Sequence, residues 1–314
     1  MKFLHCAGVA SLFTAFVLAA LQVSCTTVPP SPLSSTALEG RILEVRAGRF
    51  VPRHELIGRA VGARLVILGE THDNGTHHRL QAEILAAMVG AGRLPDLAME
   101  QFDREHQPAL DAAHALWKQD GKQDGNQDAE TLAHAGRFDR KGWRWADYKP
   151  LLEIAAAHNL RILAANFSRD EARALMKSGK SAEGVGALDP QARASLEKDL
   201  VDGHCGLRPP DSVLIGMVEA QRARDAQMAK TLSLAGPEGA VLIAGAGHAR
   251  RDRGAPAYLP AALVDNLLSI AFIEIEPQGR ADLTRYAGLF DFVWFTERAP
   301  RADPCKDFRL PAGR

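Results

Sequence analysis

The amino-acid sequence predicts an α/β fold with a mostly parallel sheet that is flanked by helices and carries helical insertions. Two observations support this prediction: short apolar runs of strand length recur along the chain, and segments with a helical pattern separate them. Strands that alternate with helices over such a length favour a parallel sheet covered on both faces. The predicted strands are 64–70, 96–102, 161–167, 240–247, 271–276 and 292–296, and the clearest predicted helices are 77–91, 147–159, 169–178 and 211–235.

The first 25 residues have the features of a secretory signal peptide, which lies outside the fold. Lys2 supplies a positive start, the apolar region AGVASLFTAFVLAAL follows, and small residues close the segment at VSCTT. Cys25 stands where a bacterial lipoprotein carries its lipidated cysteine, although Gln22 occupies a position where such signals usually have leucine. Lipidation at Cys25 and ordinary signal cleavage therefore both stay open. Residues 26–39 are a Pro/Ser-rich tether.

The rest of the chain is predicted to form one domain, 40–300, followed by a C-terminal tail, 301–314. Of the 314 residues, 46% are hydrophobic, and 38 basic residues balance 38 acidic ones. A formal net charge of zero argues against nucleic acid as a partner. After residue 30 no apolar stretch reaches the roughly eighteen residues that a membrane-spanning helix needs. The regions 100–150 and 170–238 are mostly helical insertions, and the polar stretch 118–130 is expected to be a solvated loop.

Ionisable side chains follow the predicted strands at the point where each strand ends. Glu70 and His72 follow the first strand, Glu100 the second and His248 the fourth. Ligands of open α/β sheets bind at the carboxyl ends of the strands, so these side chains mark a candidate site. A Glu–His set can hold a metal or activate water, whereas the alternative is a strand-end hydrogen-bond network.

Two helices border this predicted site. In the helix 77–91, one of His77 and His78 is expected to face the strand ends and the other to face solvent. In the helix 211–235, one stripe mixes polar and sulfur-containing side chains, which is typical of a pocket wall although methionine is more often core filler. Its members are Met217, Gln221, Arg224 and Met228.

The segment GAGHARRDRG, 245–254, is not a dinucleotide fingerprint, because the third glycine is missing at the required offset. Its two glycines, Gly245 and Gly247, permit a close approach of backbone to a ligand or a neighbouring strand. The arginines that follow, among them Arg250 and Arg251, either clamp carboxylates or form a solvated charged loop.

Further along the chain, aromatic residues begin the helix 147–159 and are expected to be packing residues. They are Trp143, Trp145 and Tyr148. Once export is accounted for, Cys205 and Cys305 remain, and spacing leaves open whether they form a disulfide or two free thiols.

Together these motifs closely resemble the ChaN family of haem-binding lipoproteins, within the Tiki superfamily, from about residue 40 to 300. The motifs that carry the resemblance are LGETHDNGTHH, AMEQFDRE, the aromatic segment W-x-W-x-D-Y-x-P-L, AANFSR, GHCG, M-x-x-A-Q-x-x-R-D-A-x-M-A and AGAGHARRDRGAPAYL. The resemblance implies an outer-membrane or periplasmic lipoprotein that serves iron uptake, with haem held between two protomers and a tyrosine on the iron. Of the three tyrosines, Tyr258 is the one we expect to bind iron. Relatives in the wider superfamily are hydrolases, and by that resemblance Glu70, His72, Glu100 and His248 occupy active-site positions.

Two functional hypotheses follow. In the first, the protein captures haem: Tyr258 ligates ferric iron, the stripe from Met217 to Met228, with Gln221 and Arg224, lines the ring, and Arg250 and Arg251 pair with the propionates. In the second, the four strand-end residues bind a metal or activate water in a hydrolase of the Tiki or erythromycin-esterase type.

Overall fold

Eight strands form one mixed sheet in the computed structural model, which describes residues 34–119, 128–181, 185–276, 282–306 and 308–309. The predicted signal peptide with Cys25, most of the tether and most of the polar loop 118–130 lie outside the described residues. The strands are β1 (Ile42–Glu44), β2 (Arg49–Val51), β3 (Leu65–Glu70), β4 (Asp96–Asp103), β5 (Ile162–Asn166), β6 (Ala240–Gly245), β7 (Leu267–Glu274) and β8 (Phe292–Thr296). Their spatial order is β2-β1-β8-β7-β3-β6-β4-β5.

The six predicted strands pair in parallel, which confirms the predicted α/β fold. The sequence prediction missed β1 and β2, because a strand of three residues is too short to show an alternating pattern. These two strands form an antiparallel hairpin, and β1 joins the sheet antiparallel to β8. The strand predicted at 271–276 begins earlier, at Leu267.

The principal helices are α1 (Arg53–Gly62), α2 (Gly75–Gly90), α3 (Gln107–Gln119), α4 (Ala129–Ala135), α5 (Trp145–Ala157), α6 (Arg169–Ser178), α7 (Pro190–Gly203) and α8 (Asp211–Ser233). Short helical turns are η1 (Ser35–Leu38), η2 (Arg104–His106), η3 (Ala255–Tyr258), α9 (Ala261–Val264) and η4 (Thr284–Tyr286). Within the described chain, no helix is long and apolar enough to span a bilayer.

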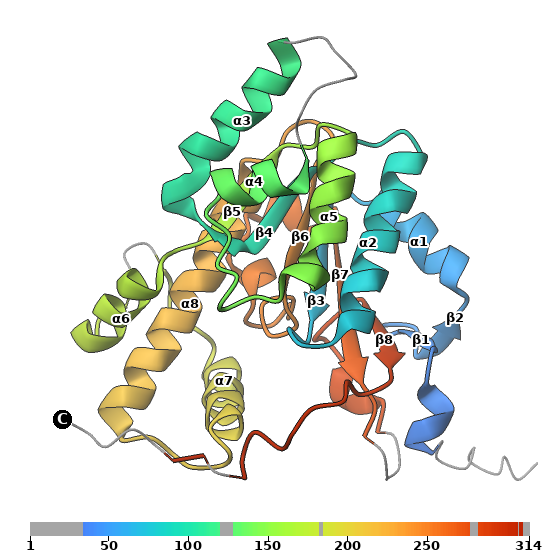
Figure 1. Cartoon of the computed structure of the whole chain (residues 1–314). Coiled ribbons are helices and arrows are strands. Elements are labelled where there is room, and N and C mark those ends of the chain that lie inside the picture. The colour runs from blue at the N-terminus through green and yellow to red at the C-terminus, as the bar shows by residue number, and fades with distance from the viewer. Residues whose placement is uncertain (1–33, 120–127, 182–184, 277–281, 307, 310–314) are drawn as a thin grey trace, which may run out of the picture. The chain divides into compact units, whose positions relative to one another are not determined.

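Alternating side chains of the strands feed two hydrophobic clusters, one on each face of the sheet. Val66 and Leu68 pack with helices α1, α2, α4 and α5, which Figure 1 shows lying together along the sheet, whereas Leu65 and Ile67 pack with α8 and η3. Because successive strand residues point to opposite faces, a strand buried on both sides reads as the continuous apolar run seen in the sequence. The sheet is therefore covered on both faces, as predicted.

A disulfide joins Cys205, just after α7, to Cys305 near the C-terminus, with the two Cα atoms 5.4 Å apart. Of the two alternatives left open by the sequence, the structure has the bonded one. Residues 301–306, predicted as a tail, are consequently fastened to the domain.

Candidate functional site

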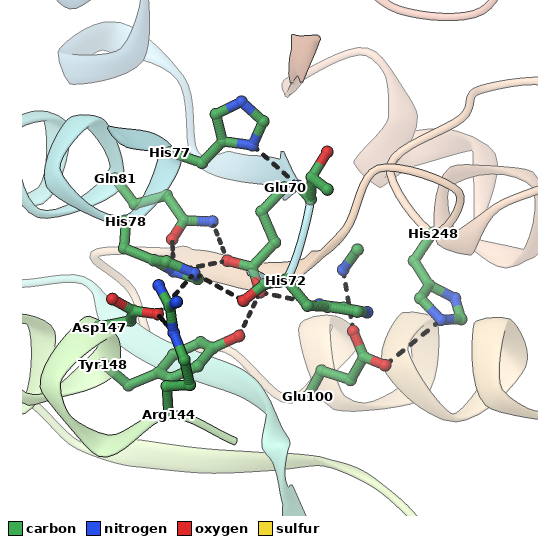
Figure 2. Close-up of polar contacts among 12 residues, drawn as sticks. Glu70, His72, His77, His78, Gln81, Glu100, Arg144, Asp147, Tyr148 and His248 are labelled. Atoms are coloured by element: carbon green, nitrogen blue, oxygen red, sulfur yellow. Dashed lines mark hydrogen bonds and ion pairs between the residues drawn. The ribbon is translucent and has the colours of Figure 1, made fainter. Parts of the chain in front are cut away.

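The ends of β3, β4 and β6 bring the four predicted site residues into one cluster (Figure 2). Glu70 ends β3, Glu100 lies on β4, and His248 follows β6, and all three are buried. His72, two residues beyond β3, keeps 47% of its side chain exposed. The cluster therefore consists of three buried groups and one imidazole that reaches solvent.

Glu70 is held by four donors from three different segments. Tyr148 Oη donates to Glu70 Oε1 at 2.5 Å and Gln81 Nε2 donates to Oε2 at 2.7 Å, while the Nδ1 atoms of His72 and His78 lie 3.0 and 3.1 Å from the carboxylate. Burial alone raises the pKa of Glu70, but the hydrogen bonds and charges of the two histidines lower it to about 2. Glu70 is consequently a carboxylate at neutral pH.

The contact with Glu70 orients the His72 ring. Because its Nδ1 faces the carboxylate, the proton of a neutral ring lies on Nδ1 and the lone pair on Nε2. Burial lowers the pKa of His72, yet the hydrogen bond that its ring donates to Glu70 and the charge of Glu100 raise it above 6.5 overall. This is the arrangement by which carboxylates prepare histidines for metal binding or for proton transfer.

Gly245 explains how the His72 ring reaches Glu100. A Cβ atom on Gly245 would lie 3.0 Å from His72 Cε1 and 3.1 Å from Nε2, so a larger residue would push the ring away. The backbone N–H of Gly245 also donates to Glu100 Oε2 at 2.9 Å. The predicted close approach at Gly245 is thus confirmed, whereas Gly247 faces open space and needs no glycine for this reason.

His248 lies between two carboxylates. Its Nδ1 is 2.6 Å from Asp225 Oδ1, and its Nε2 is 3.6 Å from Glu100 Oε1. Burial lowers the pKa of His248, but the charges of Asp225 and Glu100 raise it to about 10, so the ring is an imidazolium. The same charge lowers the pKa of Glu100 against the effect of its burial.

The terminal amide of Gln221 lies 3.0 Å from His248 Nε2. A protonated imidazole donates from both nitrogens, so it requires an acceptor at this place. We therefore assign the carbonyl oxygen of Gln221 to that position, since the oxygen and nitrogen of a terminal amide are distinguished only by their partners.

Metal ligation needs several ligand atoms close to one point. Among the described residues, three or more metal-type ligand atoms lie within 4.8 Å of one another only at Asp103, Glu105 and His106, beside the end of β4. The strand-end cluster does not meet this criterion. Its geometry suits proton transfer and activation of water, with metal binding requiring some rearrangement.

The prediction for the paired histidines was wrong in one respect, because both are buried. His77 Nδ1 accepts from the N–H of Thr71 at 2.9 Å and its Nε2 lies 2.7 Å from Thr296 Oγ1, so the first turn of α2 is covered by the end of β8. Burial lowers the pKa of His77 to about 4, and the ring is neutral. His78 lies on the other side and contacts Glu70.

Three contributors were not predicted as site residues. Tyr148 was expected only to pack, and it does so at zero exposure while its hydroxyl binds Glu70. Gln81 lies one turn along α2 from His78, with 3.2 Å between His78 Nδ1 and Gln81 Oε1. Asp225 follows Gln221 by four residues on α8, a spacing that places both on one helix face and could have identified it.

The residues predicted to hold haem are distributed over two environments. Tyr258 lines a cavity of about 820 Å³ between α6, α8 and η3. Arg224 is half-buried, reaches Asn166 Oδ1 at 3.2 Å and lies over the Phe167 ring at 5.3 Å. Met217 is half-buried, and Gln221 belongs to the His248 cluster.

Three other members of that set make contacts within the chain. Met228 has no exposed surface and packs in the core beneath α8, because its turn of the helix faces the sheet. Arg250 pairs with Asp252 at 2.6 Å, and Arg251 pairs with Asp291 at 2.7 Å. The loop arginines thus clamp carboxylates of the chain itself.

Comparison with known proteins places these observations in a family. The profile described as "Haem-binding uptake, Tiki superfamily, ChaN" matches residues 56–259. The chain belongs to this family. Among curated proteins there is no significant match.

A solved structure supports the fold. The structure titled "Cofacial heme binding to ChaN of Campylobacter jejuni" is 23% identical with a TM-score of 0.65, covering 81% of this chain and 95% of that one. The type III effector HopBA1 is 17% identical with a TM-score of 0.41, covering 78% of this chain and 92% of that one. At these identities the likeness concerns the fold, and the second is too weak to support any argument.

Proposed function

We propose that this protein binds haem as an exported member of the ChaN family. Membership in a haem-binding uptake family, and the cofacial haem binding of the similar ChaN of Campylobacter jejuni, support haem as the ligand class. The observation that carries the proposal for this chain is the cavity lined by Tyr258. Its volume of about 820 Å³ lies in the range of small-molecule and cofactor sites.

The lining of the cavity fits a flat, amphipathic ring. Phe167, Leu175 and Ala223 supply apolar surface, and Arg104 and Lys230 supply cations for propionates. Arg104 already contacts Glu171, so a propionate would compete for it, whereas Lys230 has no ion-pair partner among the described residues. Bound haem would supply ferric iron, which binds anionic oxygen donors such as the tyrosinate that Tyr258 would offer.

The Tyr258 hydroxyl is buried and makes no hydrogen bond of standard geometry among the described residues, although the Arg222 guanidinium lies next to it. A poorly satisfied buried hydroxyl costs free energy, which ligation would recover. Burial raises the pKa of Tyr258 above its usual value despite the Arg222 guanidinium nearby, so the phenol is neutral until a metal replaces its proton. Because the oxygen is shielded from solvent, ligation also requires the side chain to rotate toward the cavity.

Export to an oxidising compartment is part of this proposal. The Cys205–Cys305 disulfide supports it, because structural disulfides persist in the periplasm and outside the cell but rarely in the cytosol. We further propose lipidation at Cys25, attachment to the outer membrane and a homodimer formed around haem. Fractionation of cells that express wild type and Cys25→Ala tests the anchor: equal membrane association of both would exclude it.

Hemin titration tests the ligand. Wild type should give a Soret band with a weak charge-transfer band of tyrosinate ligation, and Tyr258→Phe should weaken binding at least about tenfold, the equivalent of 1.4 kcal/mol. Tyr286→Phe is the matched control, since Tyr286 lies outside the cavity lining. Equal spectra and affinities for Tyr258→Phe and wild type would exclude Tyr258 as the iron ligand.

A second function is favoured by the strand-end cluster. A half-exposed His72 backed by a buried carboxylate, beside a second carboxylate and an imidazolium, is more elaborate than a ring-binding surface requires. We propose that it activates water for ester or amide hydrolysis. His72→Ala should abolish turnover of chromogenic esters and the exposed His158→Ala should not. No turnover by wild type, with or without added Zn²⁺ or Mn²⁺, would reject this function.

A further inference from the structure

We propose that residues 297–306 form a strap, locked by the Cys205–Cys305 disulfide, that holds the loop carrying His72 in place over the strand-end cluster. Its regulatory meaning rests on the proposed hydrolytic function, whereas its mechanical part can be tested without any activity. The strap lies between β8 and the turn that connects α7 with α8, and Figure 1 shows this segment in red running from one to the other.

The first end of the strap is bonded to the His72 loop itself. Arg301 Nε lies 2.8 Å from Asp73 Oδ2, and Asn74 Nδ2 donates to the carbonyl oxygen of Glu297 at 3.0 Å. Asp73 and Asn74 are the two residues that follow His72. The strap therefore contacts the loop directly beside its functional side chain.

Glu274, at the end of β7, forms hydrogen bonds with both the loop and the strap. Its Oε1 accepts from Asn74 Nδ2 at 2.8 Å and from the N–H of Ala299 at 3.0 Å, and it also contacts Arg301. Glu274 Oε1 thus accepts hydrogen bonds from both the loop and the strap. Burial raises the pKa of Glu274, but these donors lower it overall, which keeps the carboxylate charged.

Asn74 also caps α2, since its side-chain oxygen accepts a hydrogen bond from the N–H of Thr76 at 2.9 Å. The strap consequently acts on both the loop and the start of the helix that supplies His78 to Glu70. Within the loop, the N–H of Asn74 donates to the Thr71 carbonyl at 2.9 Å. From α2, His77 Nδ1 accepts from the Thr71 N–H at 2.9 Å and His78 Nε2 lies 3.1 Å from the His72 carbonyl oxygen. The position of the loop therefore depends on its two neighbours, α2 and the strap.

The second end of the strap is covalent. Cys305 is bonded to Cys205, which takes a left-handed conformation with φ of 59° between Gly203 and Gly206. A glycine or asparagine is favoured at such a position, so cysteine there carries a conformational cost. The ring of Phe308 also lies 5.8 Å from that of His204. The disulfide keeps the strap at high effective concentration next to the loop.

Reduction would release this end. A dithiol that attacks the disulfide gives two electrons and two protons, leaves Cys205 and Cys305 as thiols and becomes a disulfide itself. The ion pair of Arg301 with Asp73 would then be a partly exposed pair at a free chain end, which contributes little by itself. The site is thereby complete in an oxidising compartment and loosened in a reducing one.

Hydrogen exchange of single amides tests the strap on the full mature chain. The reporters are the N–H groups of Thr71, which donates to His77 Nδ1 on α2, and of Asn74, which donates to the Thr71 carbonyl in the loop. Arg301→Ala, Cys205→Ser/Cys305→Ser and dithiothreitol-treated wild type should each exchange about tenfold faster at both reporters, because local opening becomes easier. The amides of β3 should stay protected over the same labelling period.

Arg298→Ala is the matched control, because Arg298 lies on the strap but is exposed and makes no ion pair among the described residues. It should exchange like wild type. Unchanged reporters in Arg301→Ala and after reduction would overturn the proposal, as would equal acceleration in Arg298→Ala. Simultaneous loss of protection in β3 would also overturn it, since the disulfide would then support the whole fold rather than the loop. None of these results depends on hydrolysis.

Discussion

Tyr148→Phe removes one hydroxyl group, the one that donates a hydrogen bond to the buried carboxylate of Glu70. Tyr148 Oη donates to Glu70 Oε1 at 2.5 Å, both groups are buried, and the ring itself packs between α2 and α4 without exposure. Phenylalanine keeps the ring and its packing, so the substitution isolates the hydrogen bond. A hydrogen bond to a charged group contributes about 1.5–3 kcal/mol, and we expect the free energy of unfolding to fall by about 2 kcal/mol at pH 7.

The pH dependence of this loss distinguishes the hydrogen bond from general damage. Glu70 has a pKa of about 2 when folded against an ordinary value of 4.5, so its ionised form contributes stability above pH 4.5 and this contribution is lost as the pH falls toward 2. Tyr148→Phe raises the folded pKa of Glu70. The difference between variant and wild type should therefore shrink as the pH falls through this range.

Urea unfolding followed by tryptophan fluorescence measures both effects. Tyr286→Phe is the control: Tyr286 is also mostly buried, but no hydrogen bond to a carboxylate is found for it among the described residues. It should lose no more than about 0.5 kcal/mol, as is usual where no specific partner is removed. The reasoning is refuted if Tyr148→Phe is as stable as wild type, or if its deficit is the same at pH 3 and pH 7.

Three further outcomes are expected. Asp225→Asn removes the nearer of the two carboxylates at His248, so the pKa of His248 should fall from about 10 toward 6.5 in an NMR titration; an unchanged value would show that Asp225 is not its partner. The buried neutral His77, with a pKa of about 4 against 6.5 unfolded, contributes stability above pH 6.5 that is lost as the pH falls toward 4, so His77→Gln should flatten the stability profile in that window. Met228→Ala should cost about 2–5 kcal/mol of stability and leave hemin affinity unchanged, and a selective loss of hemin binding would return Met228 to the haem site.

The apolar runs and the residues that follow them were sufficient to predict the α/β fold, six of its strands and the four strand-end side chains. This worked because a parallel strand buried on both faces is a continuous apolar run, and its carboxyl end lies at the edge where ligands bind. Glu70, Glu100 and His248 could be recognised one strand at a time, since each prediction needed only local pattern and a general rule about sheets.

Only the tertiary structure decided which groups meet. Strand order places β3 and β4 on either side of β6, so that His72 and Glu100 both lie next to Gly245, and the spacing of residues along the chain does not reveal that order. The same holds for Tyr148, which lies 78 residues from Glu70, and for Cys205 and Cys305, which are 100 residues apart. Met217 and Met228 lie three helical turns apart on one stripe of α8. Met228 is fully buried and Met217 is only half-buried, and this difference depends on how α8 packs against the sheet. Contacts of this kind are set by the packing of whole elements, because a side chain's partner depends on where every element between them has folded.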